Sequence, residues 1–301
     1  MPPMLSVVIA CRNAEATLGV QLEALAREPR HSEWDILLCD NGSTDGTIAL
    51  AESYRSRLPT LRIVTADEQP GPAYARNVGA AQTRARWLAF VDADDEIAPG
   101  WIDAMFAALD AHAFVAGRFE STRLNSAAVL RTRQLQQDDG LQDCGIGPRL
   151  PHAGAGNMGI HRAVFEAVGG FDADLGCLED TDFCWRVQLA GVPLVFWPDA
   201  VVHVRLRSTM RRMWRQGRGY GAATAQLEHR YAGVTRADLP VGGSPVAPVV
   251  DEPASGRGGL LGLLRGARTP GALIWRLGWH AGHRGWTPAP GPRTPRTPQA
   301  A

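Results

Sequence analysis

The feature that most constrains the fold is the alternation of short apolar runs with segments of helical periodicity. Four runs predict buried strands, at residues 5–10, 35–39, 61–65 and 87–91. Between them, apolar side chains recur three or four residues apart, as at Leu18, Leu22 and Leu25, and this spacing predicts helices. Further along, strands are expected near residues 194–196 and 200–204, and helices over residues 179–189 and 208–227, the last of them basic. Weak periodicity over residues 120–155 predicts a variable loop region with a strand or two at most. Alternating strands and helices are typical of an α/β fold with a mainly parallel sheet.

An acidic cluster follows the fourth apolar run, where Asp92, Asp94 and Asp95 stand close together. Adjacent carboxylates repel one another unless a cation neutralises them, and hard oxygen ligands suit Mg²⁺ or Mn²⁺. In open α/β sheets, ligands bind outside the carboxyl ends of the strands. We therefore predict a metal platform for a phosphorylated ligand, with a solvated acidic turn as the alternative.

Seven motifs then occur in a characteristic order along the chain. They are SVVIACRN at 6–13, DNGSTDGT at 40–47, GPAYARNVG at 71–79, FVDADD at 90–95, GNMG at 156–159 with VGGFD at 168–172, and LEDTDF at 178–183. Over roughly residues 4–225 this order resembles the inverting glycosyltransferases of family 2, which have a GT-A fold. The resemblance implies a Rossmann-like, mixed but mainly parallel sheet, and a nucleotide-sugar donor of UDP or dTDP type.

The resemblance also implies a metal site for Mg²⁺ or Mn²⁺. Asp94 matches the main metal ligand of the family, at the last position of its Asp-x-Asp motif, and Asp92 matches the residue that supports the ribose or the metal. His203 stands where parts of the GT-A group have a histidine at the metal or diphosphate. A hydrogen-bonded structural histidine is the alternative for that position.

Donor-binding residues are implied at three further places. Asp40 and Asn41 match the pair that reads the nucleobase, although many relatives have two aspartates there, and an Asx turn is the alternative. Arg76 matches an arginine that supports the donor site, with a salt bridge to one of the site's own aspartates as the alternative. The end of the first strand supplies three more expected donor contacts, Ala10, Arg12 and Asn13.

The catalytic base is expected in the Glu179-Asp180 pair. Inversion requires a carboxylate that accepts the proton of the attacking hydroxyl, and Asp180 matches the family's usual position for this group. Asn157, Glu179 and Asp182 are expected to bind the acceptor. The alternative is that these acids only favour the start of a helix through its dipole.

Charge is unevenly distributed along the chain. Residues 1–200 have a net charge of −11 and residues 201–301 a net charge of +11. We predict a GT-A domain at 1–228, a Pro/Gly-rich linker at 229–258, a basic amphipathic segment at 259–286 and a disordered tail at 287–301. The basic segment has the composition of a helix that binds an anionic membrane surface, whereas packing on the protein or on a second subunit is the alternative.

The remaining composition narrows the class of protein. Five cysteines without a CxxC pair indicate reduced thiols in a cytoplasmic protein, which would lie at the inner face of the cell membrane if the basic segment binds there. We expect a saccharide or lipid-linked acceptor and no nucleic acid. A non-catalytic sugar-nucleotide-binding or scaffold protein and a nucleotidyltransferase are the rival functions, while the absence of Gly-x-Gly-x-x-Gly disfavours a dinucleotide dehydrogenase.

Overall fold

The computed structural model describes residues 2–29, 32–131, 137–235, 249–251 and 269–288. Most of the predicted linker, the residues 259–268 of the predicted basic segment and nearly all of the predicted disordered tail lie outside the described residues.

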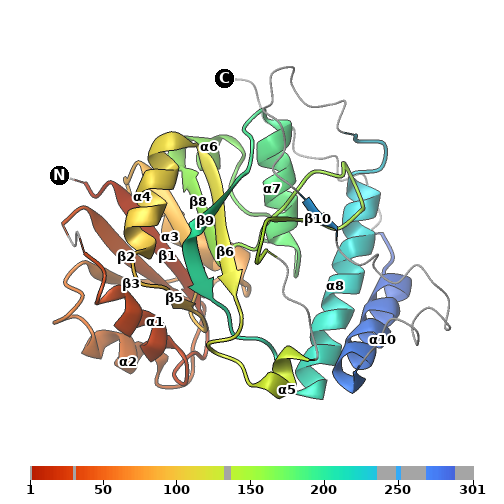
Figure 1. Ribbon diagram of the computed structural model, residues 1–301, viewed down its shortest axis with the longest axis horizontal. Coiled ribbons are helices and arrows are strands. Elements are labelled where there is room, and N and C mark those ends of the chain that lie inside the picture. Colours follow the sequence, from red (N-terminus) through yellow and green to blue (C-terminus); the bar gives the residue numbers. More distant parts are fainter. Residues whose placement is uncertain (1, 30–31, 132–136, 236–248, 252–268, 289–301) are drawn as a thin grey trace.

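One eight-stranded mixed sheet organises the described chain, in the order β3-β2-β1-β4-β8-β6-β9-β5 (Figure 1). The strands are β1 (Leu5–Cys11), β2 (Trp34–Asp40), β3 (Leu61–Thr65), β4 (Trp87–Asp92), β5 (Glu96–Ile97), β6 (Phe114–Glu120), β8 (Asn157–His161) and β9 (Val195–His203). The first four strands are parallel to one another, and β6 is parallel to β9. Strand β8 runs antiparallel to β4 and β6, and β5 runs antiparallel to β9. The predicted mixed, mainly parallel α/β fold is confirmed.

Each face of the sheet has its own hydrophobic core because side chains alternate along the strands. Leu5, Val7 and Ile9 of β1 contact the core that holds α1 (Leu18–Leu25), α2 (Thr47–Ser53) and α4 (Trp101–Ala111). Val8 belongs to the opposite core, which holds α3 (Pro72–Ala81), α6 (Arg162–Ala167) and α7 (Glu179–Leu189). The helices thus cover both faces and leave the carboxyl ends of the first strands at one edge.

Two parts of the sheet differ from the sequence-based expectation. Strand β6 was not among the predicted strands, because its short run contains Gly117 and Arg118. Residues 194–196 and 200–204 predicted two strands, whereas β9 is a single strand that continues through Pro198 and Asp199. The pairing of β6 with β9 shifts register between Gly117 and Arg118, and this irregularity accommodates the proline.

The stretch between β6 and β8 contains little regular structure, as predicted. It holds α5 (Ala127–Leu130) and β7 (Leu141–Asp143), and β7 pairs with β10 (Val249–Asp251) in a second, two-stranded sheet. This stretch connects β6 and β8, which remain neighbours in the main sheet although the connection is long.

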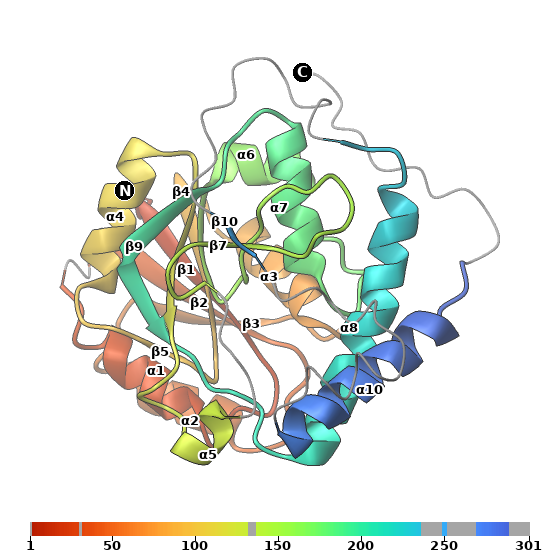
Figure 2. The same cartoon turned by 45° about the vertical axis from the view of Figure 1, so that its right-hand side comes forward.

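A helix pair lies beside the sheet domain, formed by α8 (Met210–Arg230) and α10 (Pro270–Gly285) (Figure 2). Gly217 of α8 faces the backbone at Trp275, and Gly221, one turn later, faces Trp279, so the helices run parallel. Helix α10 therefore packs on the protein's own helix, which was the alternative to a membrane anchor. Helix α8 continues two residues beyond the domain boundary predicted at 228.

In the part of the chain that the structure describes, no helix combines the length and the apolar character needed to cross a membrane.

Candidate active site

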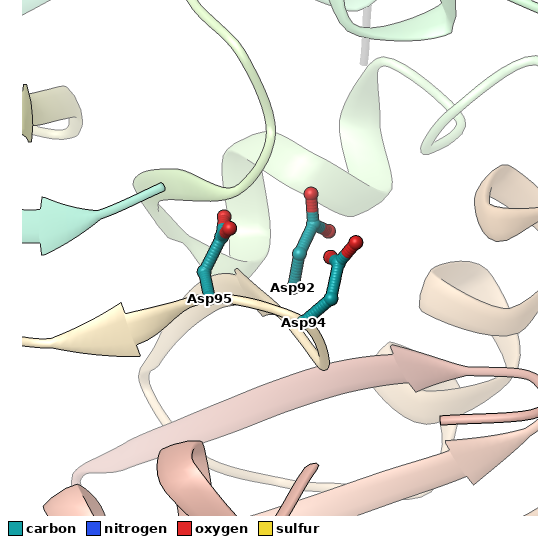
Figure 3. A group of neighbouring side chains, drawn as sticks. All are labelled: Asp92, Asp94 and Asp95. Carbon is teal, nitrogen blue, oxygen red and sulfur yellow. The ribbon is translucent and has the colours of Figure 1, made fainter. Parts of the chain in front are cut away.

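The acidic cluster lies where β4 ends, and its three side chains converge. Asp92 is the last residue of β4, and Asp94 and Asp95 follow in the turn to β5. One carboxylate oxygen from each of the three lies within 4.8 Å of the others (Figure 3). Burial, and then the charge of Asp92, raises the pKa of Asp94. Burial and both neighbouring carboxylates raise the pKa of Asp95 well above its usual value.

This donor set fits a divalent cation. Three carboxylates held this close are costly when ionised, and a Mg²⁺ or Mn²⁺ ion would remove that repulsion. Asp95 is 5% exposed and accepts a hydrogen bond from the Arg205 backbone N–H at 2.8 Å. The Arg205 Nε donates to the Asp94 carbonyl oxygen at 3.0 Å, so the segment after β9 holds the acidic turn in place.

Arg76 joins the acidic cluster to the start of α7. Its Nη2 donates to Asp92 Oδ1 at 2.7 Å and its Nη1 donates to Glu179 Oε1 at 2.9 Å. Arg76 as a whole is only 4% exposed, and the carboxylates of Asp92 and Glu179 raise its pKa against the effect of burial. The salt bridge that was an alternative for Arg76 is thus present, and it reaches two carboxylates.

Close packing of α3 on the sheet sets the position of Arg76. A Cβ added at Gly79 would lie 2.4 Å from Cys39 Sγ and 2.6 Å from Val8 Cγ1, so only glycine permits this approach. Arg76 lies one helical turn before Gly79, which brings its guanidinium to the carboxyl end of β4.

Asp180 lies in the first turn of α7, next to Glu179. Burial, and then the neighbouring Glu179 carboxylate, raises the pKa of Asp180 to about 7. The Thr181 backbone N–H donates to Asp180 Oδ1 at 2.8 Å. Because Glu179 is paired with Arg76 and Asp180 has no ion pair among the described residues, Asp180 is the carboxylate of this pair that can still accept a proton near neutral pH.

The loops after β1 and β2 are joined to each other at the same edge of the sheet. The Asn13 backbone N–H donates to Ser43 Oγ at 2.9 Å, and the Thr44 N–H donates to Asn13 Oδ1 at 2.8 Å. Asn13 adopts a left-handed backbone with φ of 52°, which asparagine tolerates well. Arg12 is exposed beside it, and Ala10 pairs in register with Asp92 of β4.

Asp40 and Asn41 have different surroundings although they are adjacent. Asp40 accepts from the Ser43 N–H at 3.2 Å and remains half-buried at the end of β2. Asn41 is buried; its Nδ2 donates to the carbonyl oxygens of Ala66 and Gln69, and its Oδ1 accepts from the Gly71 N–H. Both amide protons of Asn41 are therefore used within the protein, and a nucleobase contact by the Asp40-Asn41 pair stays a prediction.

Two of the expected acceptor contacts are instead buried structural residues. Asn157 is fully buried, where its Nδ2 donates to the carbonyls of Arg118 and Ala200 and its Oδ1 accepts from Trp101 Nε1. Asp182 is also fully buried, with ion pairs to Arg186 and Arg230. Neither side chain reaches the site, so the structure contradicts an acceptor contact for Asn157 and for Asp182.

His203 and Glu179 each have a partner within the protein. His203 Nδ1 lies 2.6 Å from Glu120 Oε2, and His203 is not part of the carboxylate cluster found among the described residues. This pairing uses Nδ1 alone, so the metal role of His203 stays a prediction beside the structural alternative. Glu179, expected at the acceptor, faces Arg76 instead.

Three arginines beside the acidic turn were not among the predicted site residues. Arg205, Arg207 and Arg212 line a pocket of about 250 Å³ together with Asp94. The signal in the sequence was the basic composition after His203, which predicted a basic helix but not its closeness to the acidic turn.

Comparisons with known proteins agree with this geometry. Residues 6–177 match the family model described as glycosyl transferase family 2. The chain is 26% identical over 228 residues to glycosyltransferase AglE of Haloferax volcanii, covering 72% of this chain and 73% of that protein. It is 25% identical over 149 residues to the UDP-Glc:alpha-D-GlcNAc-diphosphoundecaprenol beta-1,3-glucosyltransferase WfgD of Escherichia coli, covering 48% and 57%. The chain spans less than half the length of several other curated relatives.

Solved structures show the same fold. TarS 1-349 of S. aureus in complex with UDP-GlcNAc has a TM-score of 0.55 at 18% identity, with 77% of this chain and 74% of that chain covered. The mannosyltransferase PcManGT of Pyrobaculum calidifontis, in complex with GDP-Man and Mn²⁺, has a TM-score of 0.58 at 18% identity, covering 75% and 64%. The sheet order, the acidic turn at the end of β4 and the match over residues 6–177 lead to one conclusion: the chain belongs to glycosyltransferase family 2.

Proposed function

We propose that this protein is an inverting, divalent-metal-dependent glycosyltransferase that moves a sugar from a UDP- or dTDP-type donor to an acceptor hydroxyl. One observation carries the proposal: Arg76 connects the metal-binding geometry of Asp92 to the Glu179-Asp180 start of α7. A metal platform and a carboxylate with a raised pKa are thus parts of one site, as a displacement at a sugar phosphate requires.

Asp94, Asp92 and Asp95 would hold Mg²⁺ or Mn²⁺. When bound, such an ion offsets the negative charge that develops on the leaving diphosphate. The chain's own contribution is to keep the three carboxylates convergent, through the contacts of Arg205 with Asp94 and Asp95. The Mn²⁺ bound by the mannosyltransferase PcManGT supports this assignment.

Asp180 would act as the general base. Its raised pKa makes it a better proton acceptor near neutral pH than an ordinary aspartate, and the Thr181 N–H holds its carboxylate at the start of α7. Glu179 and Arg76 position the helix start against the metal platform.

The nucleoside end of the donor would lie over the joined loops after β1 and β2. Asp40 offers acceptor oxygens there, and the exposed Arg12 offers donors. TarS in complex with UDP-GlcNAc supports a UDP-type donor, whereas GDP-Man in PcManGT keeps guanine among the bases to be tested.

We propose a saccharide or lipid-linked acceptor in cell-envelope or polysaccharide synthesis, reached at the inner face of the cell membrane. The name of WfgD includes a diphosphoundecaprenol-linked acceptor, which supports a lipid-linked substrate here.

Thermal unfolding with UDP, dTDP and GDP, each with and without Mn²⁺, tests the proposal. A ligand that binds only the native state raises the midpoint by mass action, so the correct base with Mn²⁺ should give the largest rise. Asp94→Ala should remove the Mn²⁺-dependent part of that rise and leave the unliganded protein folded.

Turnover separates an enzyme from a non-catalytic binding protein. Release of nucleoside diphosphate from the donor identified in this way supports the proposal. Binding of nucleotide by Asp94→Ala as tightly as by the parent, with Mn²⁺ present, would refute the metal assignment.

A further inference from the structure

A short segment, Gly154-Ala155-Gly156, lies between the proposed base and the acidic turn. A Cβ added at Gly154 would lie 3.9 Å from Asp180 Oδ2, and one added at Gly156 would lie 2.9 Å from Asp92 Oδ2. The Cα atoms of residues two apart are separated by at most about 7 Å, so one piece of backbone borders both halves of the proposed site. The position of this segment therefore limits the space between the base and the metal platform.

The segment also contacts the base through its backbone. Burial has the largest effect on the pKa of Asp180 and raises it, whereas a hydrogen bond from the Ala155 backbone acts in the opposite direction. Such a bond favours the ionised carboxylate. Ala155 is 2% exposed, so the bond is sheltered from water. The backbone at Ala155 thus adds to the bond that Asp180 accepts from the Thr181 N–H.

The side chain of Gln137 holds this segment in place. Gln137 is 1% exposed, and its Oε1 accepts from the Gly154 backbone N–H at 2.8 Å and from Gln142 Nε2 at 2.9 Å. Its Nε2 donates to the Gly117 carbonyl oxygen at 2.8 Å. Because Gly117 belongs to β6, these bonds fasten the segment to the main sheet.

The backbone of Gln137 is held as firmly as its side chain. Its φ is 78°, in the left-handed region that residues other than glycine rarely adopt. Its carbonyl oxygen accepts from the Phe119 backbone N–H at 2.9 Å. A residue keeps such a conformation only where its surroundings determine it, and residues of this kind cluster at functional sites. The conformation of Gln137 therefore points to a task beyond filling the core.

We propose that Gln137 is a positioning residue for the transfer reaction, which acts by holding Gly154 to Gly156 between Asp180 and the acidic turn. The inference rests on the proposed function and adds a residue outside the proposed donor, metal and base residues. Such a residue matters for the rate, because a displacement of about 1 Å caused far from the reacting atoms can cost about 100-fold.

Amide hydrogen exchange on the full-length protein tests the contact without any substrate. Gln137→Met keeps the length of the side chain and removes its strong hydrogen-bonding groups. Gln137→Asn keeps the amide but is one CH₂ group shorter, and it should fold because asparagine tolerates a left-handed backbone. In both variants, amides of residues 154–157 should exchange at least about 10-fold faster, the effect of losing one hydrogen bond, while those of β1 and β4 keep their protection.

Donor hydrolysis tests the catalytic consequence. UDP-glucose, dTDP-glucose and GDP-mannose, each with Mn²⁺, are the probes, and water replaces the acceptor. The water oxygen attacks the anomeric carbon, its proton passes to Asp180, and the nucleoside diphosphate leaves with the electrons of the broken bond. Both variants should lower kcat by about 10- to 100-fold and change the KM for the donor by less than about twofold.

Thr83→Val is the matched control. It removes a buried hydroxyl that bonds with Ser6 Oγ at 2.7 Å and with the Ala85 N–H at 3.0 Å. Ser6 lies at the start of β1, whereas the site lies at the carboxyl ends of the strands. The control should therefore lose some overall stability and keep both the exchange of residues 154–157 and kcat at the parent's level.

Full protection of residues 154–157 in both Gln137 variants would overturn the inference. An equal loss of protection throughout the sheet would also overturn it, because Gln137 would then only stabilise the fold. Faster local exchange with an unchanged kcat would remove the positioning role and leave the proposed function standing, and a raised KM with unchanged kcat would assign Gln137 to donor binding. A parent that neither binds nor hydrolyses any donor would refute the proposed function itself, and the catalytic role of Gln137 with it.

Discussion

Arg76 decides how two distant parts of the chain form one site. It lies 16 residues from Asp92 and 103 from Glu179, and it contacts both carboxylates at hydrogen-bond distance. Its Nε has no hydrogen-bond partner among the described residues, so its two terminal nitrogens carry the connection. A bidentate bridge of this kind needs the planar guanidinium, which lysine cannot replace.

Replacing Arg76 should therefore destabilise the protein as well as the site. Arg76→Met leaves the largely buried Glu179 without its partner, and loss of one member of a buried pair costs about 3–5 kcal/mol. Urea unfolding measures this loss. Arg57→Met breaks an exposed pair with Glu23 and serves as control, with a much smaller expected change. Equal losses in the two variants would show that the bridge has no special structural role.

Replacing Asp180 should affect the transfer reaction and leave donor binding unchanged. Asp180→Asn keeps the size of the side chain but removes its basicity, so transfer should fall about 100-fold or more while donor binding is retained. Initial rates and nucleotide binding measure the two effects. Asp182→Asn should show the reverse pattern, with lower stability and intact site chemistry, because Asp182 is a buried partner of Arg186 and Arg230.

The raised pKa of Asp180 predicts a pH dependence of known sign. A general base works only when ionised, so the transfer rate should fall as the pH decreases through about 7. A bound divalent cation adds positive charge nearby and moves this limb to lower pH. Rate against pH for the parent and for Asp180→Asn is the measurement, and persistence of the limb in the variant would assign it to another group.

At the scale of elements, glycines define how α8 and α10 meet. A Cβ added at Gly221 would lie 1.9 Å from the Trp279 carbonyl oxygen, and one at Gly282 would lie 1.9 Å from that of Arg218. The helix backbones thus approach more closely than any side chain at these positions would allow. The tight contact explains why Trp279, in a segment with the composition of a membrane-binding helix, is buried on the protein instead.

Gly221→Ala should weaken this helix contact. The added methyl group overlaps backbone atoms of α10, and overpacking of this kind costs about 1–3 kcal/mol. Amide hydrogen exchange in α10 should become faster, reporting on local opening. Gly285→Ala is the control, since a Cβ there meets no atom within 4 Å. Unchanged exchange in the Gly221 variant would show that α10 is held by other contacts.

At the scale of the whole molecule, the charge is unevenly distributed: residues 1–200 are acidic and residues 201–301 are basic. Arg211, Arg215 and Arg218 of α8 and Arg284 of α10 are exposed on the helix pair. Each arginine near an anionic membrane contributes about 1 kcal/mol, so we predict that the group allows reversible binding to an anionic lipid surface. Such placement would bring the proposed site close to a lipid-linked acceptor.

Liposome flotation tests the membrane contact. Full-length protein should float with anionic vesicles at low salt and should be released at high salt, because screening weakens charge attraction. Neutral vesicles are the control. Changing Arg211, Arg215 and Arg218 together to Gln tests the basic face without removing α10 from its glycine contacts. Failure of the parent to float at low salt would leave the helix pair as a packing element alone.

The sequence by itself determined the features that depend on neighbouring residues. Apolar runs and helical spacing predicted β1 to β4 and α7, and the Asp92-Ala93-Asp94-Asp95 stretch located the acidic turn, because periodicity and local composition are written along the chain. The ordered motifs were sufficient to predict the family to which the chain belongs.

Only the tertiary structure decided which polar groups face the site. The burial of Asn157 and Asp182, the pairing of His203 with Glu120 and the position of Arg207 depend on residues far away in sequence. Helix α10 shows the same limit, since its amphipathic composition fits both a lipid surface and a protein surface. Solvent exposure and hydrogen-bond partners arise from chain folding, and identical local patterns are therefore compatible with a ligand contact or with a place in the core.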